Sequence, residues 1–137
     1  MKEIEQIDIS GDAGLRVRGK SKEQLFINAA RGMYDLITGG AEFGGSEVRE
    51  IGVTADSIEN AFVQWLNELI FLFDTYGFVG KVFSVTFHNT ALKAAISGDT
   101  FDPQRNDRKL LIKAATYHDL SIRDMGDHWE AVVIFDI

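Results

Sequence analysis

The residues best suited to chemistry in this sequence are two aspartates near opposite ends of the chain. Asp12 heads a short strand-like segment, and Asp136 stands next to last in the apolar run AVVIFDI, residues 131–137. A carboxylate on an apolar strand is costly unless something stabilises its charge. The carbonyl and terminal carboxylate of Ile137 add further oxygens, and such an all-oxygen set suits Ca²⁺ or Mg²⁺. These residue types therefore predict a site for a hard cation if folding brings Asp12 and Asp136 together.

Each aspartate taken alone also has an ordinary structural explanation. Aspartate is common in turns and helix caps, because its side chain accepts hydrogen bonds from nearby backbone amides. Asp74 is a third candidate, since it closes an apolar helical segment where its charge opposes the helix dipole. We therefore keep Asp74, together with Asp12 and Asp136, as a carboxylate to locate in the fold.

Other kinds of site find little support in the sequence. The chain has no cysteine, and its three histidines lack metal-ligand spacing, which argues against a zinc or thiolate site. No glycine-rich segment has the strand-to-helix setting of a nucleotide-binding loop, and no serine lies in a nucleophile elbow. The net charge of −7 argues against strong independent binding of nucleic acid, which depends on clustered Lys and Arg.

The composition predicts one domain covering residues 1–137. A chain of 137 residues that is 45% apolar and contains one proline is large enough to bury a single core. The first residues do not have the pattern of a signal peptide, and no apolar run is long enough to cross a bilayer. We therefore expect a cytoplasmic protein with no membrane segment.

The apolar periodicity predicts an α+β fold with two helices. Ser21 and Gln24 open the first helix with a capping box, and Gly39 and Gly40 end it. The second helix, within residues 61–78, is apolar nearly all round, which predicts that it is the most buried element. Strands are predicted at residues 3–9, 14–19, 47–55 (interrupted by a bulge), 82–88, 91–98, 110–124 and 128–137. We expect a mostly antiparallel sheet of about seven strands packed on the two helices.

Four segments, in order along the chain, carry a resemblance to a known family. They are GDAGLRVRGKSKEQLFINAARGMYDLI (11–37), WLNELIFLFDTYGF (65–78), FDPQRNDRKLLIKAATYHDL (101–120) and WEAVVIFDI (129–137). The hydrophobic helix in the second segment is the most specific of the four. Together they resemble archease, a small protein that accompanies the RNA-splicing ligase, and the resemblance runs essentially from end to end.

The resemblance implies a compact fold in which a β-sheet wraps two helices. It also implies a divalent cation, typically Ca²⁺ with Mg²⁺ or Mn²⁺ as alternatives, at Asp12, Asp136 and the main-chain or terminal oxygens of Ile137. Archease stimulates guanylylation of the ligase on its own histidine, so that the ligase joins RNA ends repeatedly in tRNA splicing and RNA repair. The chain is thus expected to be an activator with the ligase as its protein partner, and not an enzyme itself.

Two further residues are assigned to activation of the partner. Lys113 matches a lysine that matters to family function, and the resemblance implies that its charge lies near Asp12 and Asp136. Asp74 is the second residue in this group. The sequence departs from the family pattern at Ile9 and at Asn106, where archeases usually have histidine. These two changes bear on the contact with the ligase more than on the metal site, because Asp12 is retained.

Two other functions stay open at this point. The first is a chaperone-like module that binds other proteins through the apolar helix or a sheet edge. The second is a metal-dependent phosphodiesterase using the same carboxylates, although catalytic two-metal sites generally have more acidic ligands and a basic track for the substrate.

Overall fold

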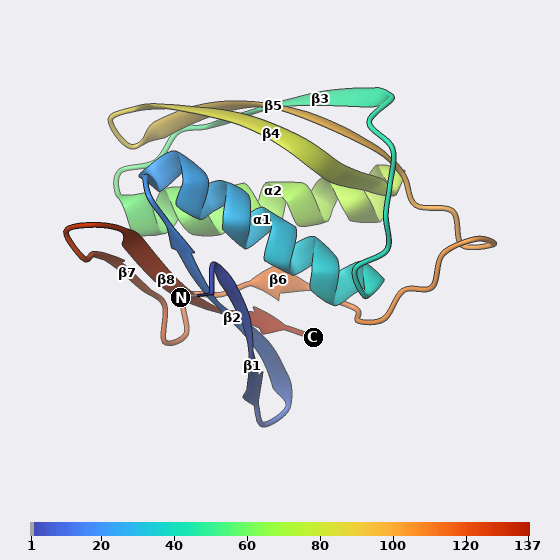
Figure 1. The fold of residues 1–137 in the computed structure, drawn as a ribbon, viewed down its shortest axis with the longest axis horizontal. Helices are drawn as coiled ribbons and strands as arrows, with labels where there is room; N and C mark the ends of the chain where they lie inside the picture. The colour runs from blue at the N-terminus through green and yellow to red at the C-terminus, as the bar shows by residue number, and fades with distance from the viewer. Residues whose placement is uncertain (1) are drawn as a thin grey trace.

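Two antiparallel sheets enclose a layer of two helices, in a computed structural model that describes residues 2–137 (Figure 1). The elements, in chain order, are β1 (Ile4–Ile9), β2 (Asp12–Gly19), α1 (Lys22–Thr38), β3 (Glu47–Val53), α2 (Ile58–Tyr76), β4 (Phe78–His88), β5 (Ala91–Thr100), β6 (Ala114–Ala115), β7 (Ser121–Asp124) and β8 (Trp129–Asp136). The α+β prediction is confirmed. The strands divide into two sheets, on opposite sides of the helices, where the sequence pattern predicted one.

The first sheet joins the two ends of the chain. Its strands run in the order β1-β2-β8-β6, and β7 also pairs with β8. Leu15 and Val17 of β2 point into the core and are fully buried, as are Val133 and Phe135 of β8. Because side chains alternate between the two faces of a strand, the residues between them lie on the outer face of this sheet. The sequence predicts this alternation of side chains, but it does not predict that β2 pairs with β8.

The second sheet has the strand order β3-β5-β4 and contains a bulge that the sequence analysis misplaced. The bulge was expected within residues 47–55, whereas β3 pairs regularly with β5. The register instead shifts in β4 between Gly80 and Val82, which leaves Lys81 as the extra residue. Glycine is needed at position 80 because a Cβ atom there would lie 2.8 Å from Ile96 Cγ2 and 3.0 Å from Phe83 Cζ.

Helix α1 begins and ends as its sequence predicts. The Ser21 hydroxyl accepts a hydrogen bond from the Gln24 amide, and Gly39 ends the helix in the left-handed conformation. In a full capping box the Gln24 side chain would bond back to the Ser21 amide. Here it donates instead to Asn28 Oδ1 at 2.8 Å. Asn28 is fully buried and donates in turn to the Arg18 carbonyl, which ties α1 to the end of β2.

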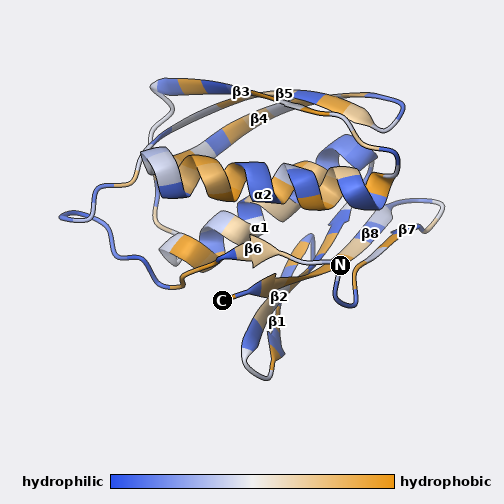
Figure 2. Cartoon of the chain, turned by 180° about the vertical axis from the view of Figure 1, so that it is seen from behind, coloured by the Kyte–Doolittle hydropathy of each residue, from blue (hydrophilic) through white to orange (hydrophobic). Residues whose placement is uncertain are grey.

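The prediction that α2 is the most buried element is wrong. Eleven of the 17 residues of α1 are buried, against nine of the 19 in α2. Helix α1 lies against β2 of one sheet and β4 of the other, whereas one side of α2 faces solvent. Phe71 is 53% exposed on that side, and Figure 2 shows polar residues interrupting the apolar surface of α2. No helix within residues 2–137 is long and apolar enough to span a membrane.

Of the strand predicted over residues 110–124, only two short pieces form, Ala114–Ala115 (β6) and Ser121–Asp124 (β7). Before β6 the chain makes a turn at 102–106, where the amides of Arg105 and Asn106 donate to the Asp102 carbonyl. The Lys109 amide then donates to the Ile37 carbonyl at the end of α1. Within the predicted strand, the Lys113 amide donates to the Asp136 carbonyl and the Thr116 amide to the Ile134 carbonyl, so pairing with β8 is confined to residues 113–116.

Candidate functional site

Asp12 and Asp136 come to the same end of the first sheet. The last recorded pair between β2 and β8 places Ala13 opposite Phe135, and one further step of the same register leads to Asp12 and Asp136. Strands in a sheet lie about 4.8 Å apart, so the two backbones are neighbours at this point. Phe135 points into the core, and both aspartate side chains therefore leave the outer face. We call Asp12, Asp136 and Ile137 the acidic corner.

Lys113 reaches the acidic corner through its backbone. Its amide donates to the Asp136 carbonyl at 2.8 Å, and the next residue, Ala114, lies opposite Asp136 in the β6–β8 pairing. The Lys113 side chain is exposed and makes no ion pair within 4 Å among residues 2–137. The backbone of Lys113 thus lies beside Asp136, and its charged end is free to contact another molecule.

Asn67 is a positioning residue that the sequence analysis overlooked. It lies in the middle of α2, where its Oδ1 accepts from the Ala115 amide at 2.8 Å and its Nδ2 donates to the Ala115 carbonyl at 3.4 Å. The side-chain amide therefore takes the place of a neighbouring strand on one side of β6. A polar residue interrupting an apolar helix was the only signal in the sequence. Asn67 holds β6 beside β8, and β6 in turn fixes the backbone of Lys113.

The donor set of the acidic corner fits a hard cation only with help from main-chain oxygens or water. No group of three or more His, Cys, Asp or Glu side chains within residues 2–137 is arranged to hold a metal ion. Asp12 is partly exposed and Asp136 is exposed, and neither carboxylate has a hydrogen-bond or ion-pair partner in the described chain. The oxygens of Ile137 extend the set. An exposed all-oxygen set completed by water suits Ca²⁺ or Mg²⁺.

Asp74 stands apart from the acidic corner. It is exposed and lies two turns beyond Asn67 on the same face of α2, which is about 10 Å along the helix axis. Its side chain makes no hydrogen bond within the described residues. A role for Asp74 in contact with a partner therefore stays a prediction that is separate from the metal set.

The two positions that depart from the family pattern have different surroundings. Ile9 is paired with Asp12 across the turn between β1 and β2, so a histidine there would lie next to the acidic corner. Asn106 accepts a hydrogen bond from the Asp102 amide through its Oδ1 at 3.0 Å and closes the 102–106 turn. With Ile9 in place of the usual histidine, this position beside Asp12 has no polar side chain, whereas Asn106 has a local structural role.

The histidines form no cluster within residues 2–137. His128 is bonded to its neighbour Asp127 at 2.6 Å, and this contact lowers the pKa of the Asp127 carboxyl. His118 lies 3.4 Å from the adjacent Asp119. Both contacts join neighbours in sequence at the surface and are local.

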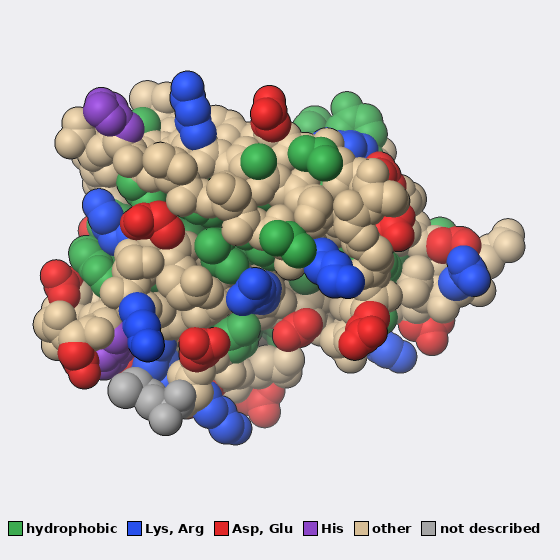
Figure 3. Space-filling view, turned by 45° about the horizontal axis from the view of Figure 1, so that its top comes forward, with side chains coloured by type: hydrophobic (Ala, Val, Ile, Leu, Met, Phe, Trp, Pro, Cys, Tyr) green, Lys and Arg blue, Asp and Glu red, His purple; other side chains and the backbone are tan. Residues whose placement is uncertain are grey.

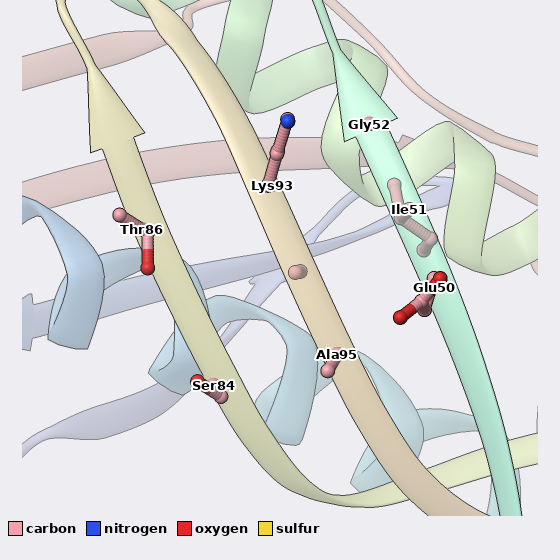
Figure 4. A pocket seen from close by; sticks show the side chains of 8 residues that line it. Glu50, Ile51, Gly52, Ser84, Thr86, Lys93 and Ala95 are labelled. Atoms are coloured by element: carbon pink, nitrogen blue, oxygen red, sulfur yellow. The ribbon is translucent and has the colours of Figure 1, made fainter.

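A broad depression of about 520 Å³ lies on the outer face of the second sheet and gathers no catalytic groups. Its floor is made of small residues such as Gly52, Ser84 and Ala95. Figure 4 shows Glu50 on β3 and Lys93 on β5 directed away from each other, and no ion pair joins them. This face is an open sheet surface with small side chains.

The fold and the acidic corner define a class: a small protein of two sheets around two helices, with carboxylates where its second and last strands, β2 and β8, meet. Residues 5–137 match the model of the Archease protein family (MTH1598/TM1083). The chain therefore belongs to the archease family.

Relatives of known name agree with this assignment. Over 142 residues the chain is 33% identical to a Protein archease of Pyrococcus abyssi, and over 139 residues it is 27% identical to that of Sulfurisphaera tokodaii, with all of both chains covered in each case. The solution structure of Methanobacterium thermoautotrophicum protein 1598 matches with a TM-score of 0.82 and 28% identity, over the full length of both chains.

A second solved structure shares the fold. A Thermotoga maritima protein described as an archease and possible chaperone matches with a TM-score of 0.68 and 23% identity, over 96% of this chain and 94% of that one. The agreement in fold extends over nearly the whole chain.

Proposed function

We propose that this protein is a metal-binding accessory protein that activates an RNA-splicing ligase by promoting its guanylylation. The observation that carries the proposal is the convergence of the backbones of Asp12, Asp136 and Lys113 at one end of the first sheet. These residues come from three separate parts of the chain. Family membership supports the choice of partner.

In this proposal Asp12, Asp136 and the oxygens of Ile137 hold one divalent cation, most favourably Ca²⁺, with Mg²⁺ or Mn²⁺ as alternatives. Such a cation supplies positive charge that offsets the repulsion between the two carboxylates. Lys113, whose side chain is exposed, offers an ammonium group to a phosphate or carboxylate of the partner. Asn67 keeps the Lys113 backbone in place through its bonds to Ala115.

The protein acts on the ligase and not on RNA. With a net charge of −7, it is poorly suited to binding a phosphate backbone on its own, so recognition of RNA belongs to the ligase. An accessory role also fits the acidic corner, which presents two carboxylate side chains where a two-metal hydrolase needs more.

The experiment is a guanylylation assay of the cognate ligase with Ca²⁺, Mg²⁺ or Mn²⁺, in the presence and absence of this protein. We expect the wild type to raise the rate of guanylylation and the number of turnovers. Asp136→Asn and Lys113→Ala are each expected to remove most of this increase. Glu50→Gln, which changes an exposed carboxylate on the outer face of the second sheet, is the matched control and keeps full activity. Failure of the wild type to raise the rate with any of the three cations would refute the proposal.

A second candidate function is that of a chaperone-like protein-binding module. It is favoured by exposed valines on the outer face of the second sheet, Val48 at 62% and Val82 at 58% exposure. Suppression of the aggregation of an unrelated denatured protein would support it, particularly if Val82→Ser reduced the effect. The least favoured alternative, a phosphodiesterase, predicts cleavage of labelled RNA by the purified protein with Mg²⁺.

A further inference from the structure

The exposed side of α2 carries an aromatic side chain between two carboxylates. Phe71 is 53% exposed, and the residues three positions before and after it are Glu68 and Asp74, which are exposed as well. Residues three apart on a helix are neighbours on one face, so the two carboxylates flank the ring along the helix axis. Neither carboxylate forms an ion pair within 4 Å in the described part of the chain. We call Glu68, Phe71 and Asp74 the α2 ridge.

Residues 108–117 run alongside α2 in the opposite direction. Three contacts join the two segments: Tyr117 Oη to Asn60 Oδ1 (2.9 Å), the Ala115 amide to Asn67 Oδ1 (2.8 Å), and the Arg108 guanidinium to the Phe73 ring (5.0 Å to its centre). Because Lys113 lies between Arg108 and Ala115, its backbone is beside the stretch of α2 that contains Phe71. Figure 2 shows β6 next to α2 on this side of the molecule. The α2 ridge is therefore continuous with Lys113 and, through β6, with the acidic corner.

Large apolar side chains are exposed along this line. In addition to Phe71, Leu111 is 51% exposed and Tyr117 is 56% exposed on the segment that accompanies α2. Isolated apolar residues are normal at a protein surface, but several near one another mark sites of protein interaction. Aromatic rings are also enriched in the cores of protein interfaces. The fold leaves these side chains uncovered, so a partner protein that covers them gains from their burial.

Asp74 lies where its charge destabilises the helix. It belongs to the last turn of α2, which contains no basic residue. The C-terminal end of a helix has a partial negative charge, so a carboxylate there opposes the helix dipole. The protein gains no ion pair from Asp74 among residues 2–137. A cost to the fold without a compensating contact indicates that the charge serves contact with another molecule.

The charge of α2 specifies the kind of partner. The helix has three acidic residues, Glu59, Glu68 and Asp74, and no Lys or Arg. On the face of the molecule that Figure 3 shows, by contrast, acidic and basic side chains are mixed. The ligase of the proposed function must hold RNA, and proteins hold a phosphate backbone with clustered Lys and Arg. An acidic surface on a chain of net charge −7 is complementary to such a partner.

We propose that the α2 ridge is the surface that docks on the ligase, with Phe71 as its apolar anchor. The inference rests on the proposed function and separates docking from activation. The ring of Phe71 enters an apolar pocket of the ligase, and Glu68 and Asp74 contact Lys or Arg side chains at the rim of that pocket. Docking along α2 brings Lys113 and the acidic corner, on the neighbouring strands, to the site of guanylylation.

The experiment measures the affinity of the whole protein for its cognate ligase by calorimetry, together with the guanylylation assay. Phe71→Ala is expected to weaken binding about tenfold or more, as the loss of an interface anchor does. In the guanylylation assay it should raise the concentration that gives half of the maximal rate by the same factor. The maximal rate itself should be unchanged, because Lys113 and the acidic corner are intact. Asp136→Asn, by contrast, should lower the maximal rate.

Asp74→Asn tests the contribution of charge. It should weaken binding about threefold at low salt, and the difference should shrink as salt is added, because screening weakens the attraction. Its melting temperature should equal or exceed that of the wild type, since the charge that opposes the helix dipole is gone. Phe71→Ala should still unfold cooperatively, because the ring is half exposed and alanine favours helices. Val82→Ala, which removes a similarly exposed apolar side chain from the second sheet, is the control and should bind like the wild type.

Three outcomes would overturn this inference. Unchanged affinity and unchanged half-maximal concentration in Phe71→Ala, with a wild type that activates the ligase, would refute the docking role alone. Self-association of the wild type that Phe71→Ala abolishes would assign the α2 ridge to a second copy of this chain. A wild type that neither binds nor activates the ligase would refute the proposed function together with this inference.

Discussion

At the scale of single residues, Tyr34 has a buried hydroxyl that contacts the Gly80 main chain without forming a hydrogen bond of good geometry. A buried hydroxyl without a partner destabilises the folded state by about 1 to 3 kcal/mol. One turn along the same helix, the Thr38 hydroxyl is buried but donates to the Tyr34 carbonyl at 2.9 Å. The two residues therefore form a natural comparison between an unpaired and a paired buried hydroxyl.

Tyr34→Phe should raise the free energy of unfolding of the protein by about 1 kcal/mol, because it removes a buried hydroxyl that makes no hydrogen bond of good geometry. Thr38→Val should lower it by about 1 kcal/mol, because there a bonded hydroxyl is lost. Urea unfolding monitored by tryptophan fluorescence measures both. A loss of stability in Tyr34→Phe would mean that the hydroxyl has a partner in solution.

Asp35 predicts a dependence of stability on pH. Partial burial raises its pKa above the ordinary value of 3.8, so the folded state binds this proton more tightly than the unfolded state. The resulting destabilisation is complete above the folded-state pKa and disappears as the pH falls below about 3.8. Asp35→Asn should therefore melt at a higher temperature than the wild type at pH 7, with a difference that shrinks in acid. Glu68→Gln, at an exposed site on α2, is the control. A difference that is independent of pH would contradict this cause.

At the scale of elements, strand β6 depends on a side chain of α2, because both the amide and the carbonyl of Ala115 bond to Asn67. Asn67→Leu should lower the free energy of unfolding by about 2 kcal/mol, because the Ala115 amide and carbonyl lose their partners. Hydrogen exchange at Ala115 and Lys113 should accelerate more than exchange in β4 or β5. Gln64→Leu, on the exposed side of the same helix, should change neither quantity. Uniformly faster exchange in both sheets would show that Asn67 supports the whole core and not β6 in particular.

The elements also show how far the sequence alone could lead. Helix ends were predictable because Ser21 and Gly39 act through local backbone geometry. The extent of the strand predicted over 110–124 was not, because the amide and carbonyl of Ala115 bond to Asn67, a residue of α2 that is distant in sequence. The prediction of which helix is more buried was also wrong. Hydrophobicity made α2 look central, whereas one of its sides, with Gln64, Glu68 and Phe71, is exposed to solvent.

The candidate site, too, could be predicted only in part. Residue type made Asp12 and Asp136 candidates among several aspartates, since carboxylates are common ligands of hard cations, and the resemblance to archease singled them out. The register that makes them neighbours comes from the pairing of β2 with β8, which no local pattern encodes. The bulge at Gly80 and Lys81 was not foreseen in β4, because the sequence pattern placed a bulge in a different strand.

At the scale of the whole molecule, the first sheet links the beginning and the end of the chain. Strand β2 pairs with β8 along seven residues, and the acidic corner lies at the end of that pairing. Two like charges on neighbouring strands repel each other in the absence of a cation. A ligand that joins them acts only on the folded molecule, since the unfolded chain holds them far apart.

Added Ca²⁺ should therefore raise the melting temperature of the wild type, because a ligand bound only by the folded state stabilises it. At a hundredfold excess over the dissociation constant the gain is about 2.7 kcal/mol. A gain of that size corresponds to roughly 8 °C for a domain of this length.

Asp136→Asn should keep the fold and lose most of the shift, since asparagine preserves the shape and removes one charged ligand. Without Ca²⁺ its melting temperature should equal or exceed that of the wild type, because the repulsion with Asp12 is gone. Glu50→Gln should respond like the wild type. An equal Ca²⁺ shift in Asp136→Asn and wild type would place the cation elsewhere, and the acidic corner would then be an ordinary strand end.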